Sequence, residues 1–176
     1  MRLFVAVPVP EELRAKAAAL GEEIRQDGVV PVRPQNMHLT LRFLGDVAPQ
    51  KLPEIKEKLG SVRFGRFGCA LKGVGVFPNE NYVRVVWAGC ESGGGLEALA
   101  AKVAEALRGM GGDERFAAHL TIARVKKKLD LRAFLARHKD GDFGSFEAAR
   151  FGLVESVLGG PKGPEYRTLA VYEAEK

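Results

Sequence analysis

The sequence has few cysteines, few histidines and no long apolar run, and each absence narrows its possible functions. Its 176 residues include two cysteines and three histidines. Cys69 and Cys90 match no metal-binding spacing, so we expect buried free thiols in a reducing compartment and no disulfide framework. No apolar run approaches the ~20 residues of a membrane span. A membrane partner is therefore not expected.

The start of the chain reads as structure and not as a targeting signal. Residues 1–10 carry one positive charge and lead directly into a charged helical pattern, with no small-residue cleavage site. We therefore expect a first strand here and a cytoplasmic protein. The hydrophobic content of 46% is enough for a real core, and the net charge of +5 permits a polyanionic partner without establishing one.

Two copies of one tetrapeptide organise the chain. They are His38-Leu39-Thr40-Leu41 and His119-Leu120-Thr121-Ile122. The strict alternation of polar and apolar residues predicts a strand in each case. Alternate residues of a strand point to opposite faces, so each histidine shares a face with its threonine, and the apolar residues share the other.

The two motifs lie inside a longer repeat. His38 and His119 are 81 residues apart, as are Val5 and Val86, whereas Phe67 and Phe151 are 84 apart. In each half the pattern predicts a strand, a helix, the motif, a helix and a strand. The expected elements are strands over 3–7, 67–77, 82–88, 146–158 and 166–174, and helices over 11–26, after Pro49, over 96–110 and over 131–137.

This order predicts an α+β fold. We expect a duplicated βαβ-type unit that forms two pseudo-twofold lobes, with antiparallel sheets lining a central cleft and helices packed outside. One lobe would hold both ends of the chain, with the last strand in the place of a third repeat's first strand, and the other lobe would hold the middle. Because no linker composition separates the halves, residues 1–176 are predicted to form a single domain.

A pseudo-twofold axis would bring two imidazoles and two hydroxyls to one cleft. Histidine titrates near neutrality, so one ring can accept a proton while the other donates one. An in-line displacement at a phosphodiester needs this pair on opposite sides of phosphorus, and threonine hydroxyls can hold the remaining oxygens. Two histidines without a clear third ligand make a poor zinc site, so no metal is expected.

The sequence resembles the 2H phosphoesterase superfamily, which is defined by two such motifs. More narrowly, it is similar to the RNA 2′,3′-cyclic phosphodiesterases, also called LigT-like 2′-5′ RNA ligases. The matching pieces are residues 2–7 (RLFVAV), 36–45 (NMHLTLRFLG) and 119–124 (HLTIAR). One departure is Ala118, where the family often has proline before the second histidine; it removes no catalytic group.

The resemblance implies hydrolysis of RNA 2′,3′-cyclic phosphate ends to 2′-phosphates, with reversible 2′-5′ ligation and no cofactor. It implies His38 and His119 as the acid–base pair, and Thr40 and Thr121 as phosphate contacts. We assign His38 as the acid on the leaving 3′-oxygen and His119 as the base on water. The expected partner is RNA with such ends, tRNA halves among them. The protein itself is expected to be a monomer. The alternatives are action on another cyclic phosphate or a 2′-5′ oligonucleotide, or a non-catalytic RNA-binding module.

Two arginines are candidates for phosphate binding. Arg42 shares strand parity with His38 and Thr40, so it could contact phosphate or lie solvated at the sheet edge. Arg124 matches an arginine common in the family motif. By strict alternation it would face away from His119, so it needs a bulge or a strand end to reach the cleft.

Aromatic and basic residues near the motifs give weaker predictions. Phe4 and Phe43 could stack on a nucleobase, although the parity of Phe43 favours core packing. Tyr166 could line the cleft, with a structural role favoured. The run 126–128 could contact further RNA phosphates or form a solvated loop, and His138 is expected at a solvated helix end.

Overall fold

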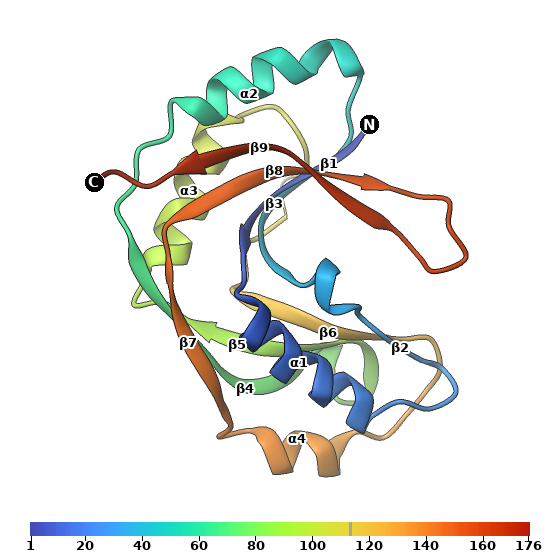
Figure 1. Cartoon of the computed structure of the whole chain (residues 1–176). Helices are drawn as coiled ribbons and strands as arrows, with labels where there is room; N and C mark the ends of the chain where they lie inside the picture. Colours follow the sequence, from blue (N-terminus) through green and yellow to red (C-terminus); the bar gives the residue numbers. More distant parts are fainter. Residues whose placement is uncertain (113) are drawn as a thin grey trace.

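The computed structural model describes residues 1–112 and 114–176, which form two antiparallel sheets (Figure 1). The four-stranded sheet has the order β3-β1-β8-β9 and the five-stranded sheet the order β2-β6-β5-β4-β7. The strands are β1 (Arg2–Pro8), β2 (Val29–Pro31), β3 (His38–Asp46), β4 (Phe67–Asn79), β5 (Tyr82–Glu91), β6 (His119–Val125), β7 (Asp142–Ala148), β8 (Arg150–Val157) and β9 (Glu165–Glu173). The α+β prediction is confirmed.

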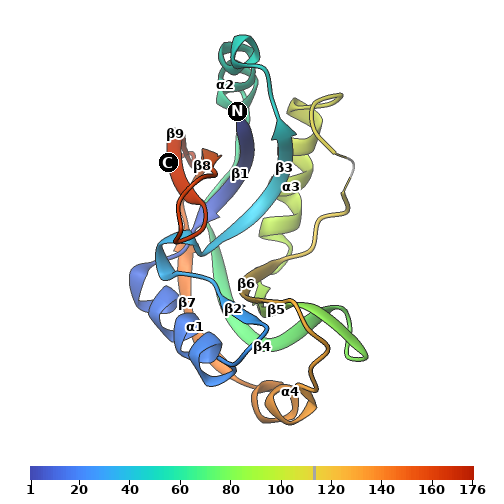
Figure 2. The same cartoon turned by 90° about the vertical axis from the view of Figure 1, so that its right-hand side faces the viewer.

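The helices of the described residues lie on the outer sides of the sheets (Figure 2). They are α1 (Glu11–Glu23), α2 (Leu52–Gly60), α3 (Gly95–Ala106) and α4 (Arg132–His138), with single 3₁₀ turns η1 (Pro34–Asn36) and η2 (Pro49–Lys51). Each long helix packs on the sheet of the other half: α1 contacts β6 and β7, and α3 contacts β3. This exchange ties the two halves together. None of the described helices is both long and apolar enough to cross a membrane.

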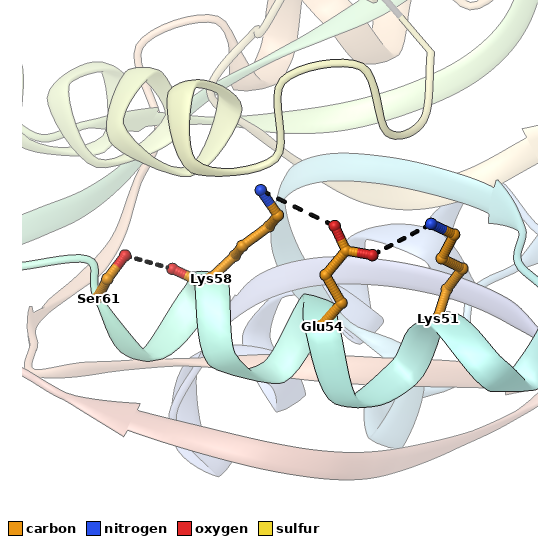
Figure 3. Close-up of polar contacts among 4 residues, drawn as sticks. All are labelled: Lys51, Glu54, Lys58 and Ser61. Atoms are coloured by element: carbon orange, nitrogen blue, oxygen red, sulfur yellow. Dashed lines mark hydrogen bonds and ion pairs between the residues drawn. The ribbon is translucent and has the colours of Figure 1, made fainter.

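Helix α2 shows how a helix is fixed to the outside of the fold (Figure 3). On its exposed side Glu54 lies between Lys51, at 3.2 Å, and Lys58, at 4.0 Å. Exposed pairs of this kind contribute at most about 1 kcal/mol. The opposite side buries Ile55 and Leu59 completely. Apolar burial, worth roughly 1.5–3 kcal/mol for each such side chain, therefore holds the helix in place.

The duplication is visible residue by residue in the strand ladders. Strand β1 pairs with β3 in the same register as β5 pairs with β6. The equivalent pairs are Pro8–His38 and Gly89–His119, Ala6–Thr40 and Trp87–Thr121, and Phe4–Phe43 and Val85–Arg124. Every partner lies 81 residues from its counterpart, the separation of the two histidines. The two halves of the cleft are therefore built on one backbone template.

Each motif strand contains a β-bulge directly after its threonine. In β3 the extra residue is Leu41, and in β6 it is Ile122. A bulge places two residues opposite one and so reverses the alternation of the residues that follow. Beyond the bulge, Phe43 and Arg124 return to the face that carries the histidines. Simple alternation could not reveal this shift.

The predicted strand over 146–158 is wrong as a single element. It is divided at Ala149 between the two sheets, because β7 pairs with β4 while β8 pairs with β1 and β9. Figure 1 shows this segment passing from the lower sheet to the upper one. Ala148 and Phe151, on either side of the crossing, are both buried. The crossing point is therefore continuous with the core, and no loop composition marks it in the sequence.

The first and last strands of the chain, β1 and β9, both belong to the four-stranded sheet, with β8 between them. The last strand was expected in the place of a third repeat's first strand, and this is wrong. Strand β1 occupies that place beside β8, and β9 pairs with the other edge of β8. The sequence equivalence of Phe67 with Phe151 is also wrong. The ladders place Gly75 opposite Trp87 and Gly152 opposite Ala6, so the two glycines are the equivalent residues.

Two helices end earlier than the periodicity predicts. Helix α1 stops at Glu23 and not at residue 26, and α3 stops at Ala106 and not at residue 110. A glycine with positive φ follows each end within five residues, Gly28 at 85° and Gly109 at 78°. These glycines allow the backbone to turn out of the helix toward the next element.

Candidate active site

The cleft between β3 and β6 holds both motifs. His38 and Thr40 line a cavity of about 180 Å³ from one side, and His119 and Thr121 line it from the other. The two strands contact each other where the sheets meet (Figure 1). One water occupies about 30 Å³ of liquid volume, so the space accommodates a phosphate group with an attacking water. The fold therefore brings together the four residues that the motifs singled out.

His38 is held by aromatic rings. Its imidazole stacks on Phe4 with ring centroids 4.6 Å apart, and it meets the edge of Tyr166 at 5.1 Å. Within the described residues its ring nitrogens make no hydrogen bond. Burial lowers the pKa of His38 to about 4. The ring is therefore neutral near pH 7 in the free protein, and both nitrogens remain available to a ligand.

His119 is oriented by the backbone. Its Nδ1 lies 2.7 Å from the carbonyl oxygen of Ala117, which requires Nδ1–H to be the donor. In the neutral ring the proton therefore sits on Nδ1, and Nε2 carries the free lone pair. Burial lowers the pKa of His119, the charge of Arg124 acts in the same direction, and the bond to Ala117 opposes both. A neutral imidazole with a free Nε2 is suited to accept a proton.

The bulges decide which further side chains reach the cleft. Arg124 lines the cavity, because the bulge at Ile122 supplies the shift that strict alternation lacked. Phe43 also lines it and is 50% exposed, so the favoured core role is wrong for this residue. Both occupy the same position in their halves. One half thus presents a cation to the cleft and the other an aromatic ring.

Arg42 is not placed for the predicted phosphate contact. Its Nε and Nη2 both donate to the carbonyl oxygen of Met110, at 3.2 and 2.8 Å. Its parity with His38 and Thr40 ends at the bulge, so it does not line the cavity between the histidines. Arg42 instead fixes the segment that follows α3.

Phe4 does not fit the predicted stacking on a base. It is only 4% exposed, and its ring is covered by His38, Phe43 and Tyr166. It supports the His38 imidazole from behind. Tyr166, for which a structural role was favoured, both supports His38 and lines the cavity.

Three polar residues of the cleft were not identified from the sequence. Arg33, Asn36 and Lys162 line the cavity together with the motif residues. Arg33 and Asn36 both donate to the carbonyl oxygen of Pro164, at 2.8 and 3.0 Å, and so hold the β8–β9 turn over the cleft. Asn36 belongs to the block that precedes the first motif, whereas Lys162 lies in a glycine- and proline-rich turn whose composition indicates only a loop.

The electrostatic character of the cleft suits an anion. Arg33, Arg124 and Lys162 contribute positive charge, and no described aspartate or glutamate lines the cavity. The hydroxyls of Thr40 and Thr121 make no hydrogen bond within the described residues, so they are free for a ligand. Donors and cations that converge in a partly buried space bind phosphate oxygens strongly.

The remaining predicted residues lie elsewhere. His138 contacts Glu23 at 2.7 Å on the outer side of the five-stranded sheet, and Lys127 pairs with Asp27. Cys69 and Cys90 are buried and free, as predicted. Across residues 1–112 and 114–176, no three His, Cys, Asp or Glu side chains gather as metal ligands would.

Comparison with known proteins identifies the family. The sequence profile described as "LigT like Phosphoesterase" matches residues 6–87. A curated Archaeoglobus fulgidus protein named RNA 2′,3′-cyclic phosphodiesterase is 42% identical over 98% of this chain and 100% of its own length. One from Methanocaldococcus jannaschii with the same name is 36% identical over 96% and 98%.

Solved structures agree over the whole fold. A crystal structure of a Thermus thermophilus protein superposes with a TM-score of 0.80 at 36% identity, covering 98% of this chain and 97% of that one. Escherichia coli LigT in complex with 3′-AMP gives 0.83 at 25% identity, covering 99% and 98%. With paired motifs, one shared cleft and relatives of this similarity, the chain belongs to the LigT-like phosphoesterases of the 2H superfamily.

Proposed function

We propose that this protein hydrolyses 2′,3′-cyclic phosphates at RNA ends to 2′-phosphates, by a two-histidine acid–base mechanism. The observation that carries the proposal is the cavity that His38, Thr40, His119 and Thr121 line together. The proposal is supported by the relatives named RNA 2′,3′-cyclic phosphodiesterase. It is also supported by the LigT structures with 3′-AMP and with phosphate.

His119 is assigned as the general base. Its Nδ1–H donates to Ala117, which leaves Nε2 free to take a proton from water as the oxygen attacks phosphorus. The bond between phosphorus and the 3′-oxygen then breaks. His38, in its protonated form, transfers a proton to that oxygen, and the product is a 2′-phosphate with a free 3′-hydroxyl. Each such proton transfer typically contributes ~10²–10⁴-fold to the rate.

His38 must gain its proton in the complex, because its pKa is about 4 in the free protein. The negative charge of a phosphodiester beside the ring favours the imidazolium and raises this pKa. His38 therefore becomes protonated, and able to act as the acid, when the substrate binds. Thr40, Thr121 and Arg124 would meanwhile donate to the non-bridging oxygens and hold phosphorus between the two rings.

The protein's own side chains supply every proton in this scheme, so the reaction is proposed to need neither metal nor nucleotide cofactor. If an RNA 5′-hydroxyl replaced water as the nucleophile, His119 and His38 would keep the same roles and a 2′-5′ linkage would form. In the reverse step the 3′-hydroxyl would attack that linkage, the 5′-oxygen would leave, and the histidines would exchange roles. We treat residues 1–176 as one domain that acts as a cytoplasmic monomer on RNA ends such as those of tRNA halves.

The test is turnover of a nucleoside 2′,3′-cyclic phosphate in EDTA. We expect a 2′-nucleotide product, with rates reduced at least ~10²-fold in His38→Ala and in His119→Ala. His138→Ala is the matched control, because that ring lies outside the cleft, and it should retain the wild-type rate. Binding of RNA without turnover would support a binding module instead. Cleavage confined to another cyclic phosphate or to 2′-5′ linkages would change the proposed substrate.

The division of roles needs a separate experiment. A cyclic substrate with sulfur in place of the 3′-oxygen releases a thiolate, which needs no protonation. His38→Ala should regain most of the wild-type rate on this substrate, whereas His119→Ala should stay slow. The opposite pattern would exchange the two assignments, and rescue of neither variant would argue against an acid at this position.

A further inference from the structure

A second hollow adjoins the active site on the other side of His38. It lies along the cleft-facing side of the four-stranded sheet and measures about 640 Å³, and it shares His38 and Tyr166 with the catalytic cavity. Small-molecule and cofactor sites measure roughly 300–1,000 Å³. The catalytic cavity takes the cyclic-phosphate end, and this groove has room for one further nucleotide of the same strand.

The repeat shows what kind of group fits the groove. In the five-stranded sheet the equivalent place is filled, because the Trp87 indole covers Gly75, where any Cβ would collide with the ring. In the four-stranded sheet Ala6 replaces the tryptophan opposite Gly152. The nearest atom to a Cβ on Gly152 is a backbone oxygen at 3.3 Å, and no ring covers it. The place over Gly152 is therefore open where the other half holds a planar aromatic ring.

The filled half also shows how such a ring relates to the catalytic histidine. The Trp87 indole lies 6.4 Å from the imidazole of His119, with Phe77 beside it at 5.3 Å. A ring over Gly152 would lie in the same relation to His38. A nucleobase has the planar shape and the stacking surface that this position accepts.

The rim of the groove carries positive charge. Arg14 and Arg150 line it, and neither forms an ion pair with a carboxylate in the described part of the chain. Arg14 donates from Nη1 to the carbonyl oxygen of Pro34 at 3.3 Å, while its buried Nε has no partner. Glu11 also lines the groove, so the balance is one net positive charge. An unpartnered buried guanidinium N–H in a groove that a second arginine also lines suits a phosphate oxygen.

We infer that this groove binds the nucleotide that precedes the cyclic-phosphate end of the RNA, with its base over Gly152 and the connecting phosphodiester at Arg14 and Arg150. The inference rests on the proposed function. The groove adjoins His38, the residue assigned to the leaving ribose oxygen, so it lies on the side where the substrate strand continues. The enzyme is thus built for an RNA end and not for a mononucleotide.

Three substrates test the inference on the full-length protein. They are a nucleoside 2′,3′-cyclic phosphate, a dinucleotide ending in the same cyclic phosphate, and that dinucleotide with its first base removed. We expect the wild-type KM to fall about tenfold from the first substrate to the second, with the third in between. Equal KM values for all three would overturn the inference. Absence of turnover on all three would instead overturn the proposed function.

Two variants separate the phosphate from the base. In the double variant Arg14→Gln/Arg150→Gln, the ratio of the mononucleotide KM to the dinucleotide KM should fall toward one. Val171 lies beside Gly152 and is 52% exposed, so Val171→Trp can cover the glycine without disturbing the core. It should abolish the advantage of the intact dinucleotide over the abasic one.

Arg167→Gln is the matched control. This arginine lies on β9 next to Thr168, but alternation points it away from the groove, toward Glu155. It should retain the wild-type ratio, and thermal melting would confirm that all variants are folded. A loss of the ratio in Arg167→Gln equal to that in the double variant would indicate general charge attraction and would overturn the assignment to this groove.

Discussion

The imidazole of His38 lies flat on the phenyl ring of Phe4, with an interplanar angle of 21°, whereas no ring of residues 1–112 or 114–176 stacks on its counterpart His119. In the second half Val85 takes the place of Phe4. His119 meets Phe77 and Trp87 only edge-on and bonds to Ala117. Two residues that are equivalent by duplication therefore have different orienting contacts.

The burial of His38 makes stability depend on pH. The pKa of His38 is about 4 when folded and ~6.5 when unfolded, so between these values only the unfolded chain binds the proton. Stability should therefore fall as pH drops from 6.5 toward 4, by up to about 3 kcal/mol from this residue. Urea melts of wild type and His38→Gln over this range measure the difference. Parallel pH curves for the two proteins would contradict the prediction.

Binding of phosphate should raise the pKa of His38. An anion between the two histidines stabilises the imidazolium and partly offsets the effect of burial. With three histidines in the chain, the ring proton signals can be followed individually by NMR in titrations with and without inorganic phosphate. His138, which lies away from the cleft, provides the internal reference. An unchanged His38 titration at saturating phosphate would exclude an anion next to this ring.

Phe4 is expected to control the same pKa. In Phe4→Leu the imidazole loses a stacked ring and gains access to water, so its pKa should move up from about 4 toward 6.5. The acidic limb of the pH–rate profile should move in the same direction. The variant should also lose roughly 1–2 kcal/mol of stability, because a buried ring is replaced by a smaller side chain. A shift in stability with no shift in the pH profile would mean that Phe4 only fills space.

The threonine hydroxyls should matter for substrate and not for folding. Neither hydroxyl bonds to the described protein, so Thr40→Val and Thr121→Val remove no contact within the fold. A hydrogen bond to a charged oxygen contributes about 1.5–3 kcal/mol, so kcat/KM should fall roughly 10–100-fold in each variant. Melting temperatures should stay close to that of wild type. A large loss of stability with unchanged kinetics would assign the hydroxyls a structural role.

Arg42 and Arg124 form a matched pair for kinetics and stability. Arg124→Gln removes a cation from the cleft, so it should raise KM with little effect on stability. Arg42→Gln breaks the two hydrogen bonds to Met110, so it should lower the free energy of unfolding by about 1–3 kcal/mol and leave KM near wild type. Enzyme assays and denaturant melts on both variants give the comparison. An exchange of these two outcomes would reverse the assignment of the arginines.

The sequence was sufficient for the parts of the site that follow from periodicity. Alternation in the two motifs placed each histidine with its threonine, and the 81-residue repeat predicted that the two pairs meet. Alternation failed one residue later, because a bulge is set by the pairing with the neighbouring strand and leaves no local signal. Phe43 and Arg42 were misassigned for this reason. For Arg124 the sequence pattern required a bulge or a strand end for the side chain to reach the cleft, and the structure has the bulge.

Contacts between segments that are distant in the sequence could not be predicted from local sequence patterns either. Arg33 and Lys162 enter the cleft because the turn after β8 folds back over the segment before β3, held through Pro164. Neither residue belongs to a periodic element. The passage of residues 142–157 from one sheet to the other has the same origin, since the choice of partner strand is a property of the whole fold.

The difference between Phe43 and Arg124 affects the orientation in which the cleft binds a phosphodiester. A site with perfect twofold symmetry offers a bound phosphodiester two orientations of equal free energy, related by exchanging its entering and leaving oxygens. An aromatic ring on one rim and a guanidinium on the other remove this degeneracy. Divergence at a single position of the duplicated template is thus enough to give the reaction a polarity along the nucleic acid chain.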